Sequence, residues 1–127
     1  MARIRANNTS GGGGVQFASG EYDLDSSKNT PIPCGFQPKT ITYDTMNGSY
    51  RQNILWDEDL IIYNNTHEQV VHYTSNNSTT HANVGDTTGA RIISIDPVGS
   101  ANNPTGGFTV GKGGSTYGTK CNYKAYG

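Results

Sequence analysis

A histidine pair beside a glutamate is the arrangement in this sequence that comes nearest to a metal site. His67, Glu68 and His72 resemble the zinc-binding pattern HExxH, but the second histidine lies one position too far along the chain. The segment also has the composition of a strand, on which positions 67 and 72 point to opposite faces. We therefore expect ordinary surface histidines here, and we expect neither a metal nor any other cofactor.

Asp57, Glu58 and Asp59 form the only acidic run of the chain. A calcium loop places oxygen ligands at alternate positions around a glycine, and this run contains no glycine. Paired carboxylates for glycoside hydrolysis are brought together in space, so the sequence leaves that alternative open. No serine lies in a GxSxG pattern, and no glycine run has the form of a phosphate-binding loop. Because the sequence lacks these catalytic motifs, we expect a protein that is not an enzyme.

Two places combine an aromatic ring with polar neighbours, as carbohydrate-binding sites do. They are Trp56 with Asp57, and Tyr63 with Asn64 and Asn65. An exposed ring can stack on a sugar while carboxylates and amides bond to its hydroxyl groups. The alternative is that each ring belongs to the core, where large aromatic residues commonly lie. We interpret these five residues as a candidate contact with glycans or with a host surface.

The elements that must position these residues are strands. The chain has 127 residues, of which 55 are Gly, Ser, Thr or Asn and only 21 are Leu, Ile, Val or Phe. The length fits one domain, and the abundant polar residues are poor helix formers that favour turns and strands. The net charge of −1 gives no electrostatic footprint for nucleic acid, and no apolar run is long enough to insert into a membrane.

Short segments in which apolar and polar residues alternate recur along the chain. Residues 39–43 alternate cleanly, and residues 60–63, 69–73, 90–95 and 107–110 are further short strand candidates. Asn47-Gly48 predicts a tight hairpin, and three prolines at residues 31–38 keep that segment from the centre of a sheet. Residues 74–89 show little pattern and predict a long surface loop. Seven to nine short strands separated by turn residues indicate an all-β antiparallel sandwich or jelly roll.

The N-terminal residues have a different composition from the rest of the chain. Four consecutive glycines at residues 11–14 predict a flexible joint, so we divide the chain into an arm at 1–14 and a β-sandwich domain at 15–127. Arg3, Ile4 and Arg5 alternate like a short strand that lies on another surface and assists assembly. A disordered terminus is the alternative. No apolar segment follows these residues, so we expect no signal peptide.

The two cysteines, Cys34 and Cys121, lie far apart and form no CxxC pair. That spacing argues against a zinc site. Because no signal peptide is expected, we predict two free and buried thiols. A disulfide between the two remains the alternative, since the first and last strands of a sandwich are often neighbours.

Several segments resemble small virion proteins of tailed bacteriophages and prophages. These proteins often carry a GF-x-P-x-x-I/V step into a strand, matched here by Gly35-Phe36-Gln37-Pro38 and the residues up to Ile41. The step follows a short Gly-Glu-Tyr-like strand, matched by residues 20–24. An I-x-S-I … GF-T-V pair is matched by residues 92–95 and 107–110, and a closing Tyr-x-Ala strand by residues 123–127. The resemblance spans about residues 15–127.

The resemblance implies a non-enzymatic β-sandwich or jelly-roll module of a tail fibre, head fibre or capsid decoration. It implies a homo-oligomer, commonly a trimer, that contacts other virion proteins such as capsid or tail and is located in the virion. Gly35, Phe36 and Pro38 would be structural turn residues, and no catalytic residue is carried over. Two alternatives stay open, namely a stand-alone glycan-binding module and a self-assembling extracellular filament subunit.

Overall fold

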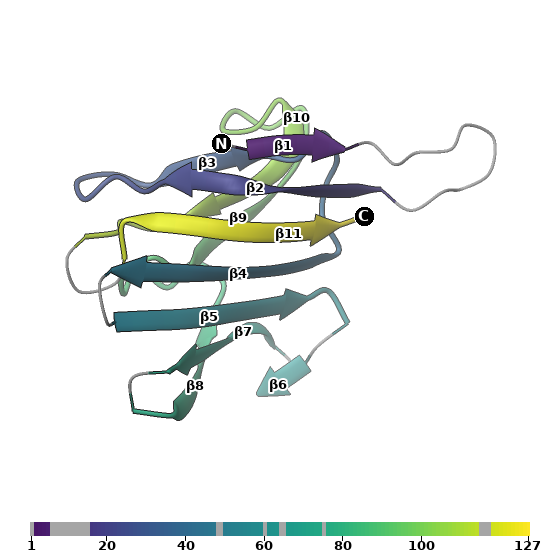
Figure 1. Ribbon diagram of the computed structural model, residues 1–127. Coiled ribbons are helices and arrows are strands. Elements are labelled where there is room, and N and C mark those ends of the chain that lie inside the picture. Colours follow the sequence, from purple (N-terminus) through teal and green to yellow (C-terminus); the bar gives the residue numbers. More distant parts are fainter. Residues whose placement is uncertain are drawn as a thin grey trace.

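The structure is a computed structural model that describes residues 2–5, 16–47, 50–59, 61–63, 66–74, 76–114 and 118–127. Within these ranges the chain forms eleven strands, all paired antiparallel, and no helix. They form two sheets, a large one of eight strands and a small one of three (Figure 1). The predicted all-β, sandwich-like class is therefore confirmed.

The large sheet has the strand order β1-β2-β11-β4-β5-β7, and both β6 and β8 pair with β7. Its strands are β1 (Ala2–Arg5), β2 (Phe17–Asp23), β4 (Thr40–Asn47), β5 (Tyr50–Asp57), β6 (Ile61–Tyr63), β7 (Thr66–Tyr73), β8 (Ser78–Asn83) and β11 (Lys120–Tyr126). The C-terminal strand β11 lies between β2 and β4, so the end of the chain completes the middle of the sheet. In β11 buried and exposed residues alternate strictly, so the two faces of this sheet have different environments.

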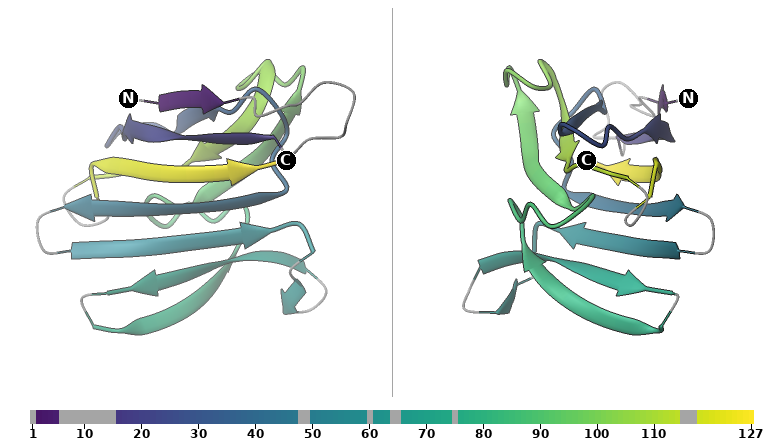
Figure 2. Two further views of the ribbon diagram at one scale, coloured as in Figure 1. Left: turned by 45° about the vertical axis from the view of Figure 1, so that its right-hand side comes forward. Right: turned by 90° about the vertical axis from the view of Figure 1, so that its left-hand side faces the viewer.

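The small sheet packs against one face of the large sheet. It contains β3 (Thr30–Pro33), β10 (Thr105–Val110) and β9 (Ile92–Val98), in the order β3-β10-β9. Its strands run across those of the large sheet, and the two layers are separated when the molecule is viewed from the side (Figure 2). The proline-containing strand β3 lies at an edge, as predicted, because proline cannot donate a ladder hydrogen bond.

The core fills the space between the two layers. Phe108 of β10 is fully buried, and its ring centroid lies 6.0 Å from that of Tyr43 and 5.5 Å from that of Tyr123. Aliphatic residues from both sheets, such as Ile41 and Ile92, surround these rings. Few residues are therefore needed to fill the core, because three aromatic rings occupy its middle.

The β4–β5 hairpin follows its predicted position. Asn47 pairs with Tyr50, and the register continues back to the pairing of Thr40 with Asp57. The prediction of a long loop at residues 74–89 is wrong for residues 78–83, which form β8 and pair with β7 in six residue pairs. Only Ala82 of β8 is buried. Because backbone pairing holds this strand, its side chains carry no hydrophobic pattern that would reveal it.

The turn that precedes β4 closes against the small sheet. Gly35 has a φ of 87°, in the left-handed region that favours glycine, and Phe36 and Pro38 are buried. The backbone N–H groups of Cys34 and Gly35 both donate to the carbonyl of Gly106, at 2.9 and 3.2 Å. A Cβ atom on Gly106 would lie 2.5 Å from the carbonyl carbon of Phe36, so glycine is required where these two segments meet.

The predicted arm contributes a strand to the large sheet. Residues 2–5 form β1, which pairs with residues 17–20 of β2 at the edge of the sheet. Residues 6–15, including the predicted glycine joint at 11–14, lie outside the described ranges. The side chains of Arg3, Ile4 and Arg5 are not described either.

Candidate functional site

Trp56, the first predicted sugar-stacking residue, belongs to the core. Its side chain is 5% exposed and points to the inner face of the large sheet with Ile54 and Ile41. The indole Nε1 atom is buried and has no hydrogen-bond partner. Trp56 therefore presents no ring face to a ligand, because β5 places it on the buried side of the sheet.

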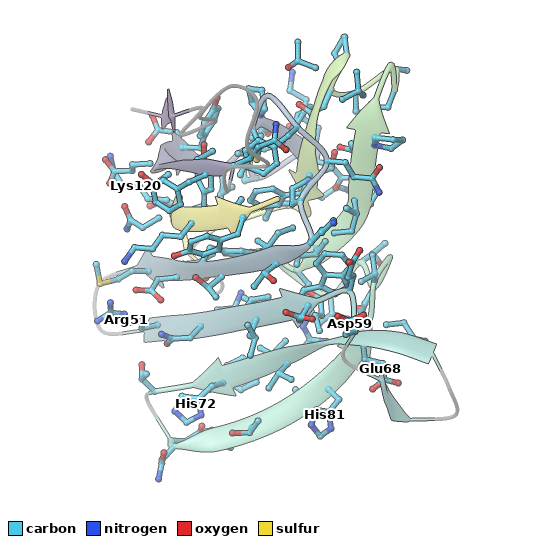
Figure 3. All side chains as sticks on the ribbon, turned by 90° about the vertical axis from the view of Figure 1, so that its right-hand side faces the viewer. Arg51, Asp59, Glu68, His72, His81 and Lys120 are labelled. Carbon is cyan, nitrogen blue, oxygen red and sulfur yellow. The ribbon has the colours of Figure 1, made fainter. Side chains whose placement is uncertain are left out.

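Asp57, its predicted polar companion, stabilises the turn after β5. Its carboxylate accepts a hydrogen bond from the backbone N–H of Asp59 at 2.9 Å and another from Thr40 Oγ1 at 2.8 Å. These two bonds lower the pKa of Asp57, with the backbone bond contributing more. Asp59 lies at the end of the large sheet opposite to Arg51 (Figure 3). A local structural role accounts for the Asp57 carboxylate.

The second predicted contact lies in a part of the chain about which less is described. Tyr63 ends strand β6, but its side chain is not described, and Asn64 and Asn65 lie outside the described residues. His72 and His81 lie on the neighbouring strands β7 and β8 (Figure 3), and His72 Nδ1 lies 3.0 Å from Thr79 Oγ1. Among the described side chains, no three potential metal ligands come together.

The outer face of the large sheet, which points away from the small sheet, carries a groove that crosses four strands. Its larger part has a volume of about 430 Å³. The outward side chains that line it are Thr42, Asp44, Asn53, Leu55, Val70 and His72. A smaller part of about 230 Å³ adjoins it over β11, where Asn122 and Lys124 join Thr42 and Asp44. We call the two parts together the sheet groove.

The Asp44 carboxylate of the sheet groove is held by two neighbouring side chains. Asp44 accepts a hydrogen bond from Asn53 Nδ2 at 2.8 Å and one from Arg51 Nη2 at 2.6 Å. The Asp44–Arg51 pair is solvent-exposed, so its contribution to stability is small. These contacts nevertheless fix the orientation of the carboxylate, and they place hydrogen-bonding groups on adjacent strands at the floor of an open surface.

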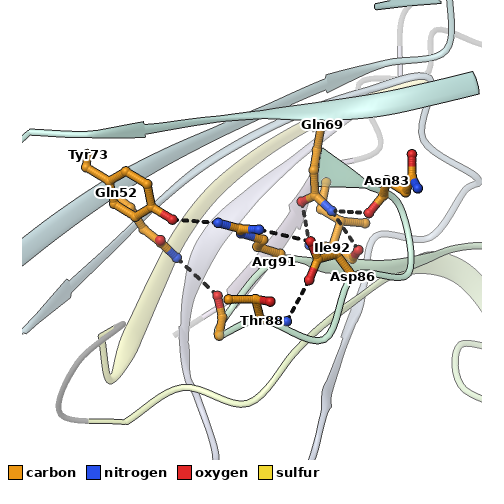
Figure 4. Close-up of polar contacts among 9 residues, drawn as sticks. Gln52, Gln69, Tyr73, Asn83, Asp86, Thr88, Arg91 and Ile92 are labelled. Atoms are coloured by element: carbon orange, nitrogen blue, oxygen red, sulfur yellow. Dashed lines mark hydrogen bonds and ion pairs between the residues drawn. The ribbon is translucent and has the colours of Figure 1, made fainter. Parts of the chain in front are cut away.

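A buried polar cluster connects the large sheet to the start of β9 (Figure 4). The side-chain amide of Gln69 donates to the carbonyl of Ile92 at 2.9 Å and accepts from its N–H at 2.7 Å. Arg91 donates to Asp86 at 2.9 Å and also bonds to the hydroxyl of Tyr73. The amide of Gln69 thus takes the place of a strand neighbour for Ile92, and the cluster serves to join the layers.

A buried carboxylate anchors the β9–β10 hairpin. Asp96 accepts hydrogen bonds of 2.7 Å from Asn103 Nδ2, Thr109 Oγ1 and Ser94 Oγ. All three donors are neutral and local, so the group is satisfied within the fold. The sequence hid this role, because an aspartate followed by proline has the pattern of a strand end rather than of a buried anchor.

Both cysteines are free and buried, as predicted. Burial, together with the nearby Asp96 carboxylate, raises the pKa of Cys34 to about 12. Burial also raises the pKa of Cys121 well above its ordinary value. Because the thiolate is the reactive form, neither group is suited to nucleophilic chemistry in the folded chain.

Comparisons with protein-family models, with curated proteins and with solved structures gave no significant match. No helix in the described part of the chain is long and apolar enough to cross a membrane. The sheet groove combines open volume with hydrogen-bonding side chains on the outer face, which makes it the strongest candidate site. The signal for it in the sequence was the alternation along residues 39–43 and 50–56, whose polar positions share one face only once the register of β4 and β5 is known.

Proposed function

We propose that the chain is a non-catalytic structural subunit of a tailed-phage virion, and that β1 is the arm through which copies associate. The resemblance of the turn and strand patterns to small virion proteins supports the first part. The observation that carries the second part is the position of β1, a four-residue strand at the extreme edge of the large sheet.

Strand β1 depends on β2 alone for its pairing. Its four residues match residues 17–20 of β2, and within the described part of the chain no other strand pairs with it. Antiparallel pairing uses backbone groups, so the same edge of a second copy offers β1 an identical partner. Residues 6–15, which include four consecutive glycines in the sequence, connect the two strands. Exchange of β1 between copies therefore preserves every backbone pair while it links the subunits.

Light scattering on the full chain tests this proposal, with two arm variants compared at equal concentration. The variant Arg3→Pro/Ile4→Pro removes two backbone donors from β1, whereas Arg3→Thr/Ile4→Val keeps a strand-forming sequence. We expect the unchanged chain and the Thr/Val variant to form a closed oligomer and the proline variant to be monomeric. Thermal unfolding would verify that the sandwich still folds.

Three results would overturn the proposal in different ways. A monomeric full chain would remove self-association, and an oligomer that survives the proline variant would remove the role of β1. A mass that grows without limit would indicate a filament subunit instead of a closed assembly. Mass spectrometry of virus particles purified from cells that make this protein tests the virion role separately, and absence of the chain from the particles would refute it.

A further inference from the structure

We propose that the sheet groove binds a neutral carbohydrate chain laid across strands β11, β4, β5 and β7. This inference goes beyond the assembly role and does not rest on it, because it concerns the face of the large sheet and not its β1 edge. It also differs from the sites expected at Trp56 and Tyr63, since it uses side chains on the open side of β4 and β5.

The shape of the groove suits an extended ligand. Its two parts share Thr42 and Asp44, so they adjoin over β4 and together extend across the strands. Neighbouring strands lie about 4.8 Å apart, a spacing comparable to the length of one sugar unit. A chain of sugars laid perpendicular to the strands would therefore place successive units over successive strands.

The floor of the groove supplies an apolar contact. Leu55 of β5 pairs in register with Val70 of β7, and Leu55 is 41% exposed. A leucine on the outer face of a sheet gains nothing from exposure to water, whereas the C–H face of a sugar ring can cover it. This patch is small, which fits one ring better than a protein interface.

The polar groups beside this patch are arranged in one row. Asp44 pairs in register with Asn53, and Asn53 pairs with His72 on the next strand. The same row extends to Asn122 on β11. The carboxylate accepts hydrogen bonds from vicinal hydroxyl groups, and the amide and imidazole groups can both donate and accept them. Their fixed positions on strands lower the entropic cost of binding.

The charge of the groove selects the class of carbohydrate. Among the described residues that line it, Asp44 is the only carboxylate and Lys124 the only lysine or arginine. Arg51 pairs with Asp44 at 2.6 Å and compensates its charge further. Beyond this compensated pair, Lys124 is a single cation rather than the cluster that would hold a polyanion, so a neutral chain fits better than an acidic one.

A printed array of neutral and acidic oligosaccharides, followed by titration of the best-bound one into isotope-labelled protein, tests the inference. We expect a neutral oligosaccharide to bind and to shift the amide signals of β4, β5 and β7. Asp44→Ala should weaken binding by at least about tenfold. The matched control is Asp23→Ala, which removes a carboxylate that is ion-paired to Lys120 on the same sheet but outside the groove.

A second pair of variants separates binding from folding. Leu55→Ser should weaken binding several-fold, whereas Met46→Ser should leave it unchanged, because Met46 is 44% exposed on a neighbouring strand and does not line the groove. All variants should keep the thermal stability of the unchanged chain to within a few degrees.

Several outcomes would overturn the inference. They include no binding to any neutral oligosaccharide, binding to acidic ones alone, equal loss in the groove and control variants, or shifts outside the groove. Shifts at the groove that grow with protein concentration in the absence of sugar would assign the face to a second copy of the chain. Repeating the titration with the proline arm variant shows whether sugar binding persists when assembly through β1 is lost.

Discussion

The two faces of the large sheet show how one backbone can serve two purposes. On β4, Ile41 and Tyr43 point inward and are buried, whereas Thr42 and Asp44 point outward and line the sheet groove. The strands, their twist and their hydrogen bonds are common to both faces. The difference therefore comes only from which residues occupy alternate positions and from the presence of the small sheet on one side.

On the inner face even a polar side chain can be buried and hydrogen-bonded within the fold. Gln69 is fully buried on β7, and its amide is taken up by the backbone of Ile92. On the outer face, Asp44 and Asn53 bond to each other while remaining partly exposed. Polar groups on the inner face thus hold the layers together, while those on the outer face remain within reach of a ligand.

The sharpest test of this comparison uses two adjacent residues of β5. Ile54 is 1% exposed on the inner face, and Leu55 is 41% exposed on the outer face. We expect Ile54→Ala to lower the free energy of unfolding by about 2–5 kcal/mol and Leu55→Ala to change it by less than about 0.5 kcal/mol. Chemical denaturation measures both. Similar losses for the two variants would mean that the outer face is covered in solution.

The polar contact between the layers should give the next largest effect. Gln69→Ala leaves the buried N–H of Ile92 without its side-chain partner, whereas the C=O of Ile92 still accepts from the N–H of Gly85 at 3.0 Å. We expect a loss of about 2–3 kcal/mol of unfolding free energy, because an unsatisfied buried polar group is costly. Asn53→Ala on the outer face is the matched control and should cost under about 1 kcal/mol. A small loss for Gln69→Ala would show that water replaces the amide.

The smallest effect concerns acid stability at the rim of the inner face. The backbone N–H of Thr88, helped by Arg91, lowers the pKa of Asp86 below its ordinary value of 3.8, although partial burial opposes this. A lowered pKa means that the stabilisation is present above pH 3.8 and is lost as the pH falls through the folded-state value.

Asp86→Asn should therefore be less stable than the unchanged chain near neutral pH, by at most about 1 kcal/mol, and the difference should fade in acid. Urea unfolding at a series of pH values measures it. A difference that stays constant with pH would show that the charge of Asp86 makes no contribution.

Much of the fold followed from local signals. The turn at Asn47-Gly48 placed the β4–β5 hairpin, and the prolines of residues 31–33 placed β3 at an edge, because both depend on backbone preferences of the residues themselves. Strand β8 was missed since its side chains are almost all exposed and its pairing with β7 leaves no periodic pattern.

The candidate site was much harder to predict. Trp56 and Asp57 looked like a ring with a polar companion, yet the register of β5 with β4 turns the ring inward. The groove side chains come from four strands; β4 and β5 form one hairpin, but β11 lies far along the chain and pairs beside β4. No single segment contains enough of them to form a recognisable motif.

By itself, the sequence determined the class of structure, the positions of several strands and turns, and the burial of two free thiols. These properties follow from the preferences of neighbouring residues and from the need to bury a small set of apolar side chains. Tertiary structure alone decided which alternate residues face the small sheet and which line the groove. That choice depends on strand register and layer packing, which are set by pairings between residues far apart in the chain.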